Sequence, residues 1–363
     1  MRIGILTYHN ALNVGAVLQA YALQTVLTKM GYNCDIIDYR SAYLEEIYKN
    51  KKFSQIKSIK DFIKWIFNAR REKSKRLKFE EFNNQYQNLS EMVYTKNNIK
   101  DSNERYDTFI VGSDQVWNMN LNGNDTTYLL DFVNENKRKV SYAASFGYKE
   151  VPQKYRKITQ KGILRLNSIS VRETAGKIIV EELTNRHSEV VLDPTLLLDK
   201  EDWDSMDYKR LHHRDYILVY IIAATPSILE FAKELGKKHN CDVVCIHNSQ
   251  LPKLGVKNVR DCSPLEFLSY IKHAKYVVSS SFHGICFSII FKKEFFFELD
   301  EKPNNNNSRI ETLIGILDLW KRQIIKGKCF DREQIDYEKV FEKLNFEKKK
   351  SYAFLINALK EKI

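Results

Sequence analysis

The sequence predicts an α/β protein with two domains, each built around a parallel sheet. Its 363 residues exceed the size of a typical single domain. Runs of β-branched and aromatic residues alternate with segments of helical periodicity on both sides of a charged segment at 199–215. We therefore expect a first domain at 1–205, a second at 206–330 and a helical tail at 331–363 that can pack back on the first domain.

The chain opens with a strand at 2–7, a helix at 16–30 ended by Gly31, and a strand at 34–39. Such a unit implies parallel strands and a right-handed crossover, with the loop before the helix at the ligand-binding edge of the sheet. Asn13 and Gly15 in this loop are candidate ligand contacts. The alternative is that Asn13 only caps the helix and Gly15 only relieves a tight turn. The chain has no GxGxxG or GxxxxGK[ST] motif, which argues against a standard dinucleotide or P-loop site.

Residues 41–103 are predicted to form a basic helical insertion in the first domain. Its apolar stripe contains Ile56, Ile59, Phe62, Ile63 and Ile66. Residues 70–76, RREKSKR, are the most basic run of the chain. Two interpretations stay open: the helix lies on an anionic membrane surface, or it is a solvated insertion that packs on the domain through its stripe.

The first domain continues with predicted strands at 107–111, 139–145, 168–171 and 189–192. Ser113 and Asp114 follow the first of these, where a serine with backbone amides can bind an anion and a carboxylate can bind a sugar hydroxyl. Arg172 follows the third strand, beside a helix that starts near Thr174. Its guanidinium suits a carboxylate or phosphate, or else forms a salt bridge with Glu173 or another exposed partner.

The second domain is predicted to contain strands at 216–222 and 241–246 and helices at 227–239 and 311–320. Ser263, followed by a proline and by Glu266, is a capping box that starts a further helix. The last helix is expected at 337–363.

Residues 275–299 are the candidate centre of the site, because they predict a strand, a serine-rich turn, a short apolar helix and a second strand. His283 falls at the start of that helix, where free N–H groups and the helix dipole attract anions. Ser280, Ser281 and Gly284 flank it as candidate contacts. The alternative is a histidine that donates to a backbone carbonyl in an ordinary turn.

The formal charge of +12 and a pI near 9.1 favour anionic partners such as nucleic acid, acidic lipid or phosphorylated substrates. Six scattered cysteines without CxxC spacing predict buried, reduced thiols and hence a cytoplasmic protein. We expect no metal, because acidic residues and histidines do not cluster in ligand spacing. The sequence has no signal-peptide pattern at its start and no apolar run of membrane-spanning length.

Several segments, taken in order, resemble the polysaccharide pyruvyl transferase family. They are residues 4–6 with 13–16 (GIL and NVGA), 112–118 (GSDQVWN), 170–173 (SVRE), 192–195 (LDPT) and 279–284 (SSSFHG). The resemblance implies a GT-B-like fold, in which two Rossmann-like domains face each other across a cleft that holds the site. It also implies transfer of the enolpyruvyl group of phosphoenolpyruvate to a sugar, forming a pyruvate ketal, with no cofactor.

By this resemblance, His283 is the catalytic acid–base group and Arg172 an anion clamp. Several family members carry an arginine two residues before the histidine, where this chain has Ser281. Arg309, or else Lys292 and Lys293, can supply the missing cation. The acceptor is expected to be a polysaccharide or a lipid-linked glycan precursor, and the basic helix would then hold the protein at the inner face of the membrane.

Two other functions stay open at this point. A glycosyltransferase of the same architecture would bind a nucleotide-sugar, with Glu298 or Asp300 on the ribose. A non-catalytic protein that binds anionic ligands such as nucleic acid would bind with a steep dependence on salt; no basic–aromatic pattern in the chain supports nucleic acid as the partner.

Overall fold

A computed structural model describes residues 1–48, 59–222, 226–249, 251–301, 307–325 and 333–360. The first domain contains a seven-stranded sheet in the order β3-β2-β1-β4-β5-β6-β7, with every pair parallel. The strands are β1 (Arg2–Leu6), β2 (Asn33–Tyr39), β3 (Leu89–Tyr94), β4 (Thr108–Val111), β5 (Arg138–Ala144), β6 (Ser168–Val171) and β7 (Glu189–Val190).

The second domain contains a five-stranded parallel sheet in the order β10-β9-β8-β11-β12. Its strands are β8 (Tyr216–Ile221), β9 (Asp242–His247), β10 (Lys257–Val259), β11 (Tyr276–Ser279) and β12 (Glu294–Phe297). The predicted α/β class with two parallel sheets is therefore confirmed. Strands β4 and β8 are buried along their whole length, and β1 is buried except at Arg2, as expected for sheets covered on both faces.

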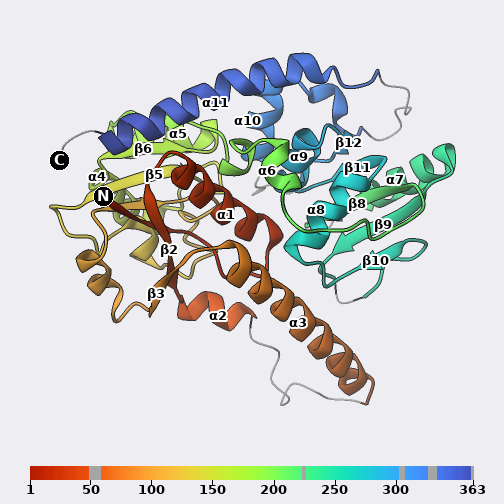
Figure 1. Ribbon diagram of the computed structural model, residues 1–363, viewed down its shortest axis with the longest axis horizontal. Helices are drawn as coiled ribbons and strands as arrows, with labels where there is room; N and C mark the ends of the chain where they lie inside the picture. Colours follow the sequence, from red (N-terminus) through yellow and green to blue (C-terminus); the bar gives the residue numbers. More distant parts are fainter. Residues whose placement is uncertain (49–58, 223–225, 250, 302–306, 326–332, 361–363) are drawn as a thin grey trace.

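Helices pack on both sheets (Figure 1). In the first domain they are α1 (Val14–Lys29), α2 (Ala42–Tyr48), α3 (Ile59–Tyr86), α4 (Gln153–Leu164) and α5 (Thr174–Thr184), with short 3-10 turns η2 (Ile99–Glu104), η3 (Thr126–Leu129) and η4 (Pro194–Leu196). The remainder are α6 (Lys200–Asp204), α7 (Pro226–His239), α8 (Pro264–His273), α9 (Phe282–Ile290), α10 (Ser308–Leu317), η5 (Trp320–Arg322) and α11 (Tyr337–Lys360).

The predicted insertion at 41–103 is not helical throughout. It contains α2 and the long helix α3, but also the edge strand β3. In β3 only Ser90 and Tyr94 are buried, so its pattern is too weak for a strand prediction from sequence. Ile56 of the predicted apolar stripe lies outside the described residues, and the side chains of the other four stripe residues lie outside them as well.

Two further boundaries differ from the prediction. The charged segment expected to be a linker contains α6, because Asp199 and Asp202 form a capping box. The helix expected at 311–320 starts earlier, at Ser308, and ends earlier, because Asp318 adopts the left-handed conformation with φ 57°. The capping box at Ser263 and Glu266 is confirmed.

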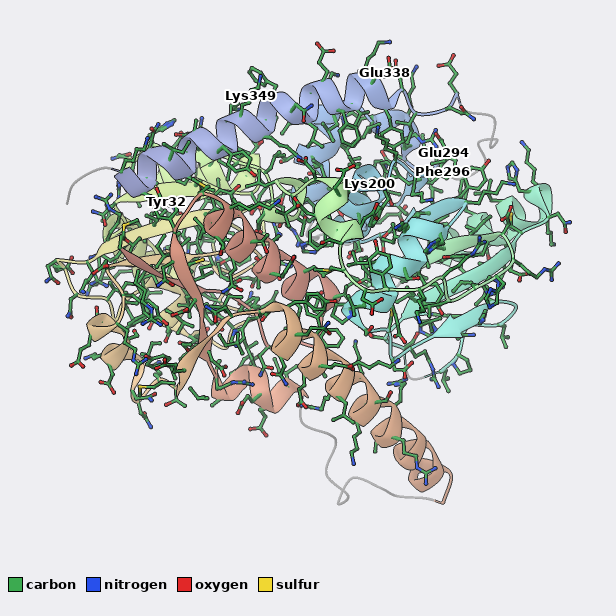
Figure 2. The ribbon with its side chains drawn as sticks, viewed as in Figure 1. Tyr32, Lys200, Glu294, Phe296, Glu338 and Lys349 are labelled. Carbon is green, nitrogen blue, oxygen red and sulfur yellow. The ribbon has the colours of Figure 1, made fainter. Side chains whose placement is uncertain are left out.

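Helices α3 and α11 cross from one domain to the other (Figure 1). The hydroxyl of Tyr337 at the start of α11 donates to the carbonyl of Lys293, whereas Arg138, the first residue of β5 in the first sheet, donates to the carbonyl of Ala358 at 3.2 Å. Glu338 and Lys349 on the outer side of α11 point to solvent (Figure 2). The helix thus joins the domains through its inner face.

A hydrophobic cluster also runs without interruption from one domain to the other. Buried Trp203 of α6 lies between Tyr21 of α1, with ring centroids 5.7 Å apart, and Phe287 of α9, at 4.8 Å. This packing positions the N-termini of α1 and α9 relative to each other, and the candidate site lies at those N-termini.

Candidate functional site

His283 is the second residue of α9, which follows β11, the strand between the central strand β8 and the edge strand β12 of the second sheet. Ser281 is the N-cap of this helix, and its hydroxyl accepts from the N–H of Gly284 at 3.4 Å. Ser281 therefore has a capping role. The His283 ring is buried, and its Nε2 has no hydrogen-bond partner within the described residues.

Asp193 is the buried carboxylate beside His283, with its Oδ2 3.6 Å from Nε2 of the ring. The same Oδ2 accepts from Arg172 at 2.7 Å and from the hydroxyl of Ser113 at 3.0 Å. Burial acts to raise the pKa of Asp193, but the nearby charges of His283 and Arg172 outweigh it, so that the pKa is lowered. Asp193 is therefore a fixed anion that can orient the histidine and stabilise its protonated form.

Arg172 is buried and has two carboxylate partners. Besides Asp193, it donates to Oδ1 of Asp114 at 3.3 Å. Burial acts to lower its pKa, but these carboxylates outweigh burial and raise it. The guanidinium thus binds carboxylates, as expected, but both belong to the protein; the alternative, a salt bridge with Glu173 or another exposed partner, is not what the structure has. Its guanidinium lies 4.7 Å from the ring centre of Phe282.

Arg309 is the cation that faces the pocket. It is the second residue of α10, and no described carboxylate forms an ion pair with it. With its amide oxygen turned toward the guanidinium, Gln115 accepts from both terminal nitrogens at 3.2 Å, while Nε has no partner among the described residues. Burial and the neighbouring charge of Arg172 lower the pKa of Arg309 to about 10. It is still a cation at neutral pH, and an incoming anion would remove the cost of its burial.

A pocket of about 320 Å³ lies between the two domains at this point. It opens among the N-terminal residues of three helices, which contribute Asn13 from α1, His283 from α9 and Arg309 from α10. Helix N-termini offer free N–H groups and a positive dipole end, so the arrangement suits an anionic ligand. The predicted residues that line the pocket are Asn13, Asp114, Ser280, Ser281, His283 and Arg309.

Asn13 has two roles. It accepts from the N–H of Gly15 at 3.0 Å and so caps α1, as its alternative interpretation held, but it also lines the pocket. Gly15, Gly284 and Ser113 do not line the pocket and lie behind it. Gly15 lies inside the helix and packs on His283: a methyl group there would be 2.0 Å from Nδ1. Gly284 packs in the same way on Ser279, and Ser113 supports Asp193.

Lys292 and Lys293 do not lie at the pocket. They follow the C-terminus of α9, about 13 Å along the helix from His283 by its rise per residue. Lys292 lies over the ring of Phe341 in α11, 4.9 Å from its centre. Of the cations offered in place of the missing arginine, only Arg309 lines the pocket.

Sequence reasoning missed Asp193, Gln115 and Asn307 as members of the site. Asp193 stands in the LDPT segment at the end of a strand, which is the same signal that identified Ser113 and Arg172. Gln115 follows Asp114 in the GSDQ loop, and both line the pocket. Asn307 belongs to an asparagine-rich loop for which sequence alone gives no position in space; it lines the pocket beside Arg309.

Within the described residues, no helix combines the length and the apolar character that a membrane span requires. The described residues contain no cluster of three or more histidine, cysteine or acidic side chains suited to a metal ion. The five described cysteines are unpaired thiols.

Two parallel-sheet α/β domains that enclose a polar pocket between the carboxyl ends of their strands define a GT-B-like protein. The chain belongs to the polysaccharide pyruvyl transferase family, whose model matches residues 13–297. Its class as a transferase of polysaccharide biosynthesis follows from this membership.

Solved structures give only a distant likeness. UDP-GlcNAc 2-epimerase of Methanocaldococcus jannaschii, in complex with UDP-GlcNAc and UDP, is 13% identical over 96% of this chain and 92% of its own, with a TM-score of 0.47. A putative UDP-N-acetylglucosamine 2-epimerase of Listeria monocytogenes is 9% identical over 100% and 98%, with a TM-score of 0.48. An alpha-glucosyltransferase in complex with UDP is 12% identical over 98% and 95%, at 0.47. Among curated proteins no match was found.

Proposed function

We propose that this protein transfers the enolpyruvyl group of phosphoenolpyruvate to a sugar of a polysaccharide or glycan precursor, forming a pyruvate ketal and releasing phosphate. The observation that carries the proposal is that His283, with the buried carboxylate of Asp193 beside it, lines the same pocket as Arg309. A histidine on a fixed carboxylate can transfer protons, and an arginine without an ion-pair partner among the described residues can bind an anion. Family membership supports the same reaction class.

The donor carries a phosphate and a carboxylate, so it needs cations and N–H donors in fixed places. Each terminal nitrogen of Arg309 carries a second N–H besides the one that Gln115 accepts, so the guanidinium can still make a two-point contact with one of these groups. The N-terminus of α9, with the serine hydroxyls at 280 and 281, offers donors for the other. We assign the anion clamp to Arg309 and give Arg172 a positioning role, because the charge of Arg172 is already balanced by Asp193 and Asp114, whereas the partner of Arg309 is the neutral amide of Gln115.

In the proposed reaction, protonated His283 gives its proton to the methylene carbon of the donor. The adjacent carbon becomes an oxocarbenium-like centre, and one sugar hydroxyl forms a C–O bond to it while its proton goes to the now neutral His283. The C–O bond to phosphate then breaks, and a second hydroxyl of the same sugar closes the ketal while its proton goes to the departing phosphate. Asp193 stays ionised and stabilises the imidazolium before the first transfer.

The direct test is to offer the protein phosphoenolpyruvate with a panel of aryl and lipid-linked glycosides. We expect phosphate release together with an acid-labile ketal product. Absence of phosphate release with every acceptor, combined with clear binding of a nucleotide-sugar, would contradict the proposal. That outcome would favour the glycosyltransferase, for which Asp300 in the pocket lining offers a ribose contact.

Two variants test the roles within the pocket. His283→Ala is expected to lower kcat by about 10²–10⁴-fold while phosphoenolpyruvate still binds. Arg309→Gln is expected to weaken phosphoenolpyruvate binding by about tenfold or more, because a charged hydrogen bond is lost. Arg70→Gln, at an exposed position on α3, is the matched control. Turnover of His283→Ala at the wild-type rate would exclude the role given to His283.

Contact with an anionic membrane surface and a cytoplasmic location stay predictions. Part of the basic run has another role in this structure, since Arg71 donates to the carbonyl of Ser249 at 3.3 Å and Lys75 to Asn248 at 3.0 Å. These contacts tie α3 to the second domain, so only the outward residues of the run are left for a lipid surface.

A further inference from the structure

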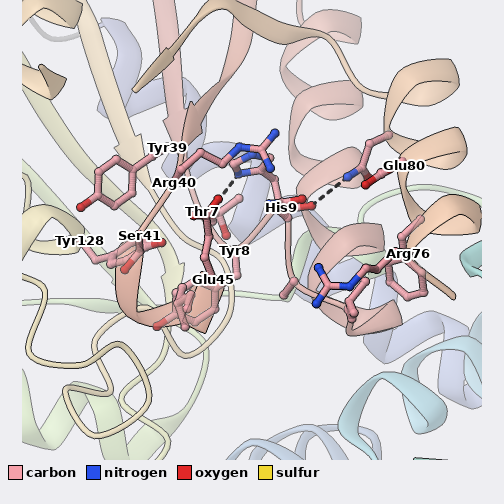
Figure 3. A pocket seen from close by; sticks show the side chains of 16 residues that line it. Thr7, Tyr8, His9, Tyr39, Arg40, Ser41, Glu45, Arg76, Glu80 and Tyr128 are labelled. Carbon is pink, nitrogen blue, oxygen red and sulfur yellow. Dashed lines mark hydrogen bonds between the residues drawn. The ribbon is translucent and has the colours of Figure 1, made fainter. Parts of the chain in front are cut away.

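A second pocket, of about 330 Å³, lies in the first domain between the loops after β1 and β2 and helix α3 (Figure 3). It shares the lining residues Tyr8, Ala11 and Leu44 with the pocket that contains His283. Two ligands that occupy the two pockets would therefore lie next to each other. The arrangement is that of a donor site and an acceptor site with a common wall.

The charges around the second pocket are balanced. Arg40 and Arg76 line it together with Glu45 and Glu80. Figure 3 shows Arg76 and Glu80 on one side of the pocket and Glu45 with Ser41 on the other. Arg40 is partly neutralised, since it donates to Oδ2 of Asp38 at 2.9 Å. Carboxylates on both sides repel a phosphate, so the pocket is not built for the anion that the first pocket suits.

The floor of the pocket is rigid. Nε2 of the buried His9 lies 3.0 Å from Oδ1 of Asp38, and its Nδ1 lies 3.3 Å from the carbonyl of Thr7. Asn83 of α3 donates to the carbonyl of His9 at 3.4 Å. The amide oxygen of Asn83 has no hydrogen-bond partner among the described residues, although the side chain is only 6% exposed. A buried acceptor without a partner is costly, and a hydroxyl group of a ligand would satisfy it.

Aromatic side chains form the rest of the wall. Tyr8 and Tyr128 meet edge to face with ring centroids 5.0 Å apart, and the buried Phe79 of α3 also lines the pocket. Rings combined with a few placed polar groups are typical of pockets for neutral organic ligands. Carboxylates, guanidinium groups and an amide together can both accept from and donate to hydroxyl groups.

We propose that this second pocket binds the neutral sugar of the acceptor and presents its hydroxyl groups to the donor held at Arg309. The proposal rests on the proposed function for the identity of the donor. The recognition itself rests on the second pocket alone: Glu45 and Glu80 accept from hydroxyl groups, Arg76 donates to ring or glycosidic oxygens, and Asn83 accepts from one further hydroxyl.

Binding of methyl glycosides of neutral hexoses, measured by saturation-transfer NMR and titration calorimetry, tests the proposal without turnover. Glu80→Ala and Glu45→Ala are expected to weaken the affinity for the bound glycoside by about tenfold or more, because a charged acceptor is lost. The matched controls are Glu81→Ala and Glu46→Ala, at exposed neighbours that do not line the pocket. These controls are expected to bind like the wild type.

Phosphoenolpyruvate binding distinguishes this proposal from the proposed function. All four variants are expected to keep the wild-type affinity for phosphoenolpyruvate, since none of these residues lines the first pocket. If glycosides bind as predicted but phosphate is never released, the proposed reaction fails and the sugar site stands. If no glycoside binds the wild-type protein, if the variants bind like their controls, or if inorganic diphosphate displaces the glycoside from the second pocket, the sugar site is wrong.

Discussion

Gly15→Ala is the sharpest test of the coupling between the two domains at the site. In most helices this substitution stabilises the protein by about 0.5–1 kcal/mol, because alanine loses less conformational entropy. Here the new methyl group would lie 2.0 Å from Nδ1 and 2.5 Å from Cγ of His283. Contacts below 3.0 Å do not persist, so the ring or the start of α1 has to move by about 1 Å.

Such a displacement sets the expected size of the effect. A shift of about 1 Å in a catalytic group costs roughly 10²-fold in rate, which is about 2.7 kcal/mol of transition-state stabilisation. Overpacking costs about 1–3 kcal/mol, and the gain in helix propensity offsets part of it. We therefore expect a small decrease in thermal stability and a decrease of about 100-fold in kcat, with little change in phosphoenolpyruvate binding.

The assay is phosphate release in the presence of acceptor, with Tm measured in parallel. Gly315→Ala is the matched control: it lies in α10, and its methyl group would make an ordinary contact of 3.8 Å with Trp320. Wild-type kcat in Gly15→Ala would refute the argument that the position of His283 depends on this contact. An equal loss of kcat in both variants would refute it too.

Three further predictions concern Asp193, Asp38 and the exposed basic residues of α3. Asp193→Asn is expected to lower the free energy of unfolding by about 3–5 kcal/mol, because it leaves the buried charge of Arg172 with one carboxylate fewer. Urea unfolding measures this free energy. A decrease of less than about 1 kcal/mol would contradict the prediction. The pKa of Asp38 is lowered to about 2 by its bonds to His9 and Arg40, which outweigh burial. The resulting stability is present above pH 4 and lost as the pH falls toward 2, so Asp38→Asn should flatten the acid-unfolding curve over that range; an unchanged curve excludes this source. For the membrane contact, Arg70→Glu with Lys73→Glu, both at exposed positions, should weaken binding to anionic vesicles at low salt, and unchanged binding argues against it.

The strands of both sheets were predictable because the signal for a buried parallel strand is local. β6 was predicted at its observed bounds, and β1, β4, β5 and β8 to within one or two residues. Each consists of a short β-branched or aromatic run followed by polar turn residues. β3 escaped prediction because an edge strand buries few side chains, and α6 because five residues carry too little periodicity.

Sequence by itself determined that His283 stands at a helix N-terminus and that Asn13, Asp114 and Arg172 follow strands. Because the carboxyl ends of parallel strands meet at one edge of a sheet, it also placed these residues at the ligand-binding edge. Only the tertiary structure decided which of these groups are available to a ligand. Arg172 is neutralised by Asp193 and Asp114, 21 and 58 residues away, whereas Arg309 faces the pocket. Ion pairing depends on distances of a few ångströms, and these arise only when remote segments pack together.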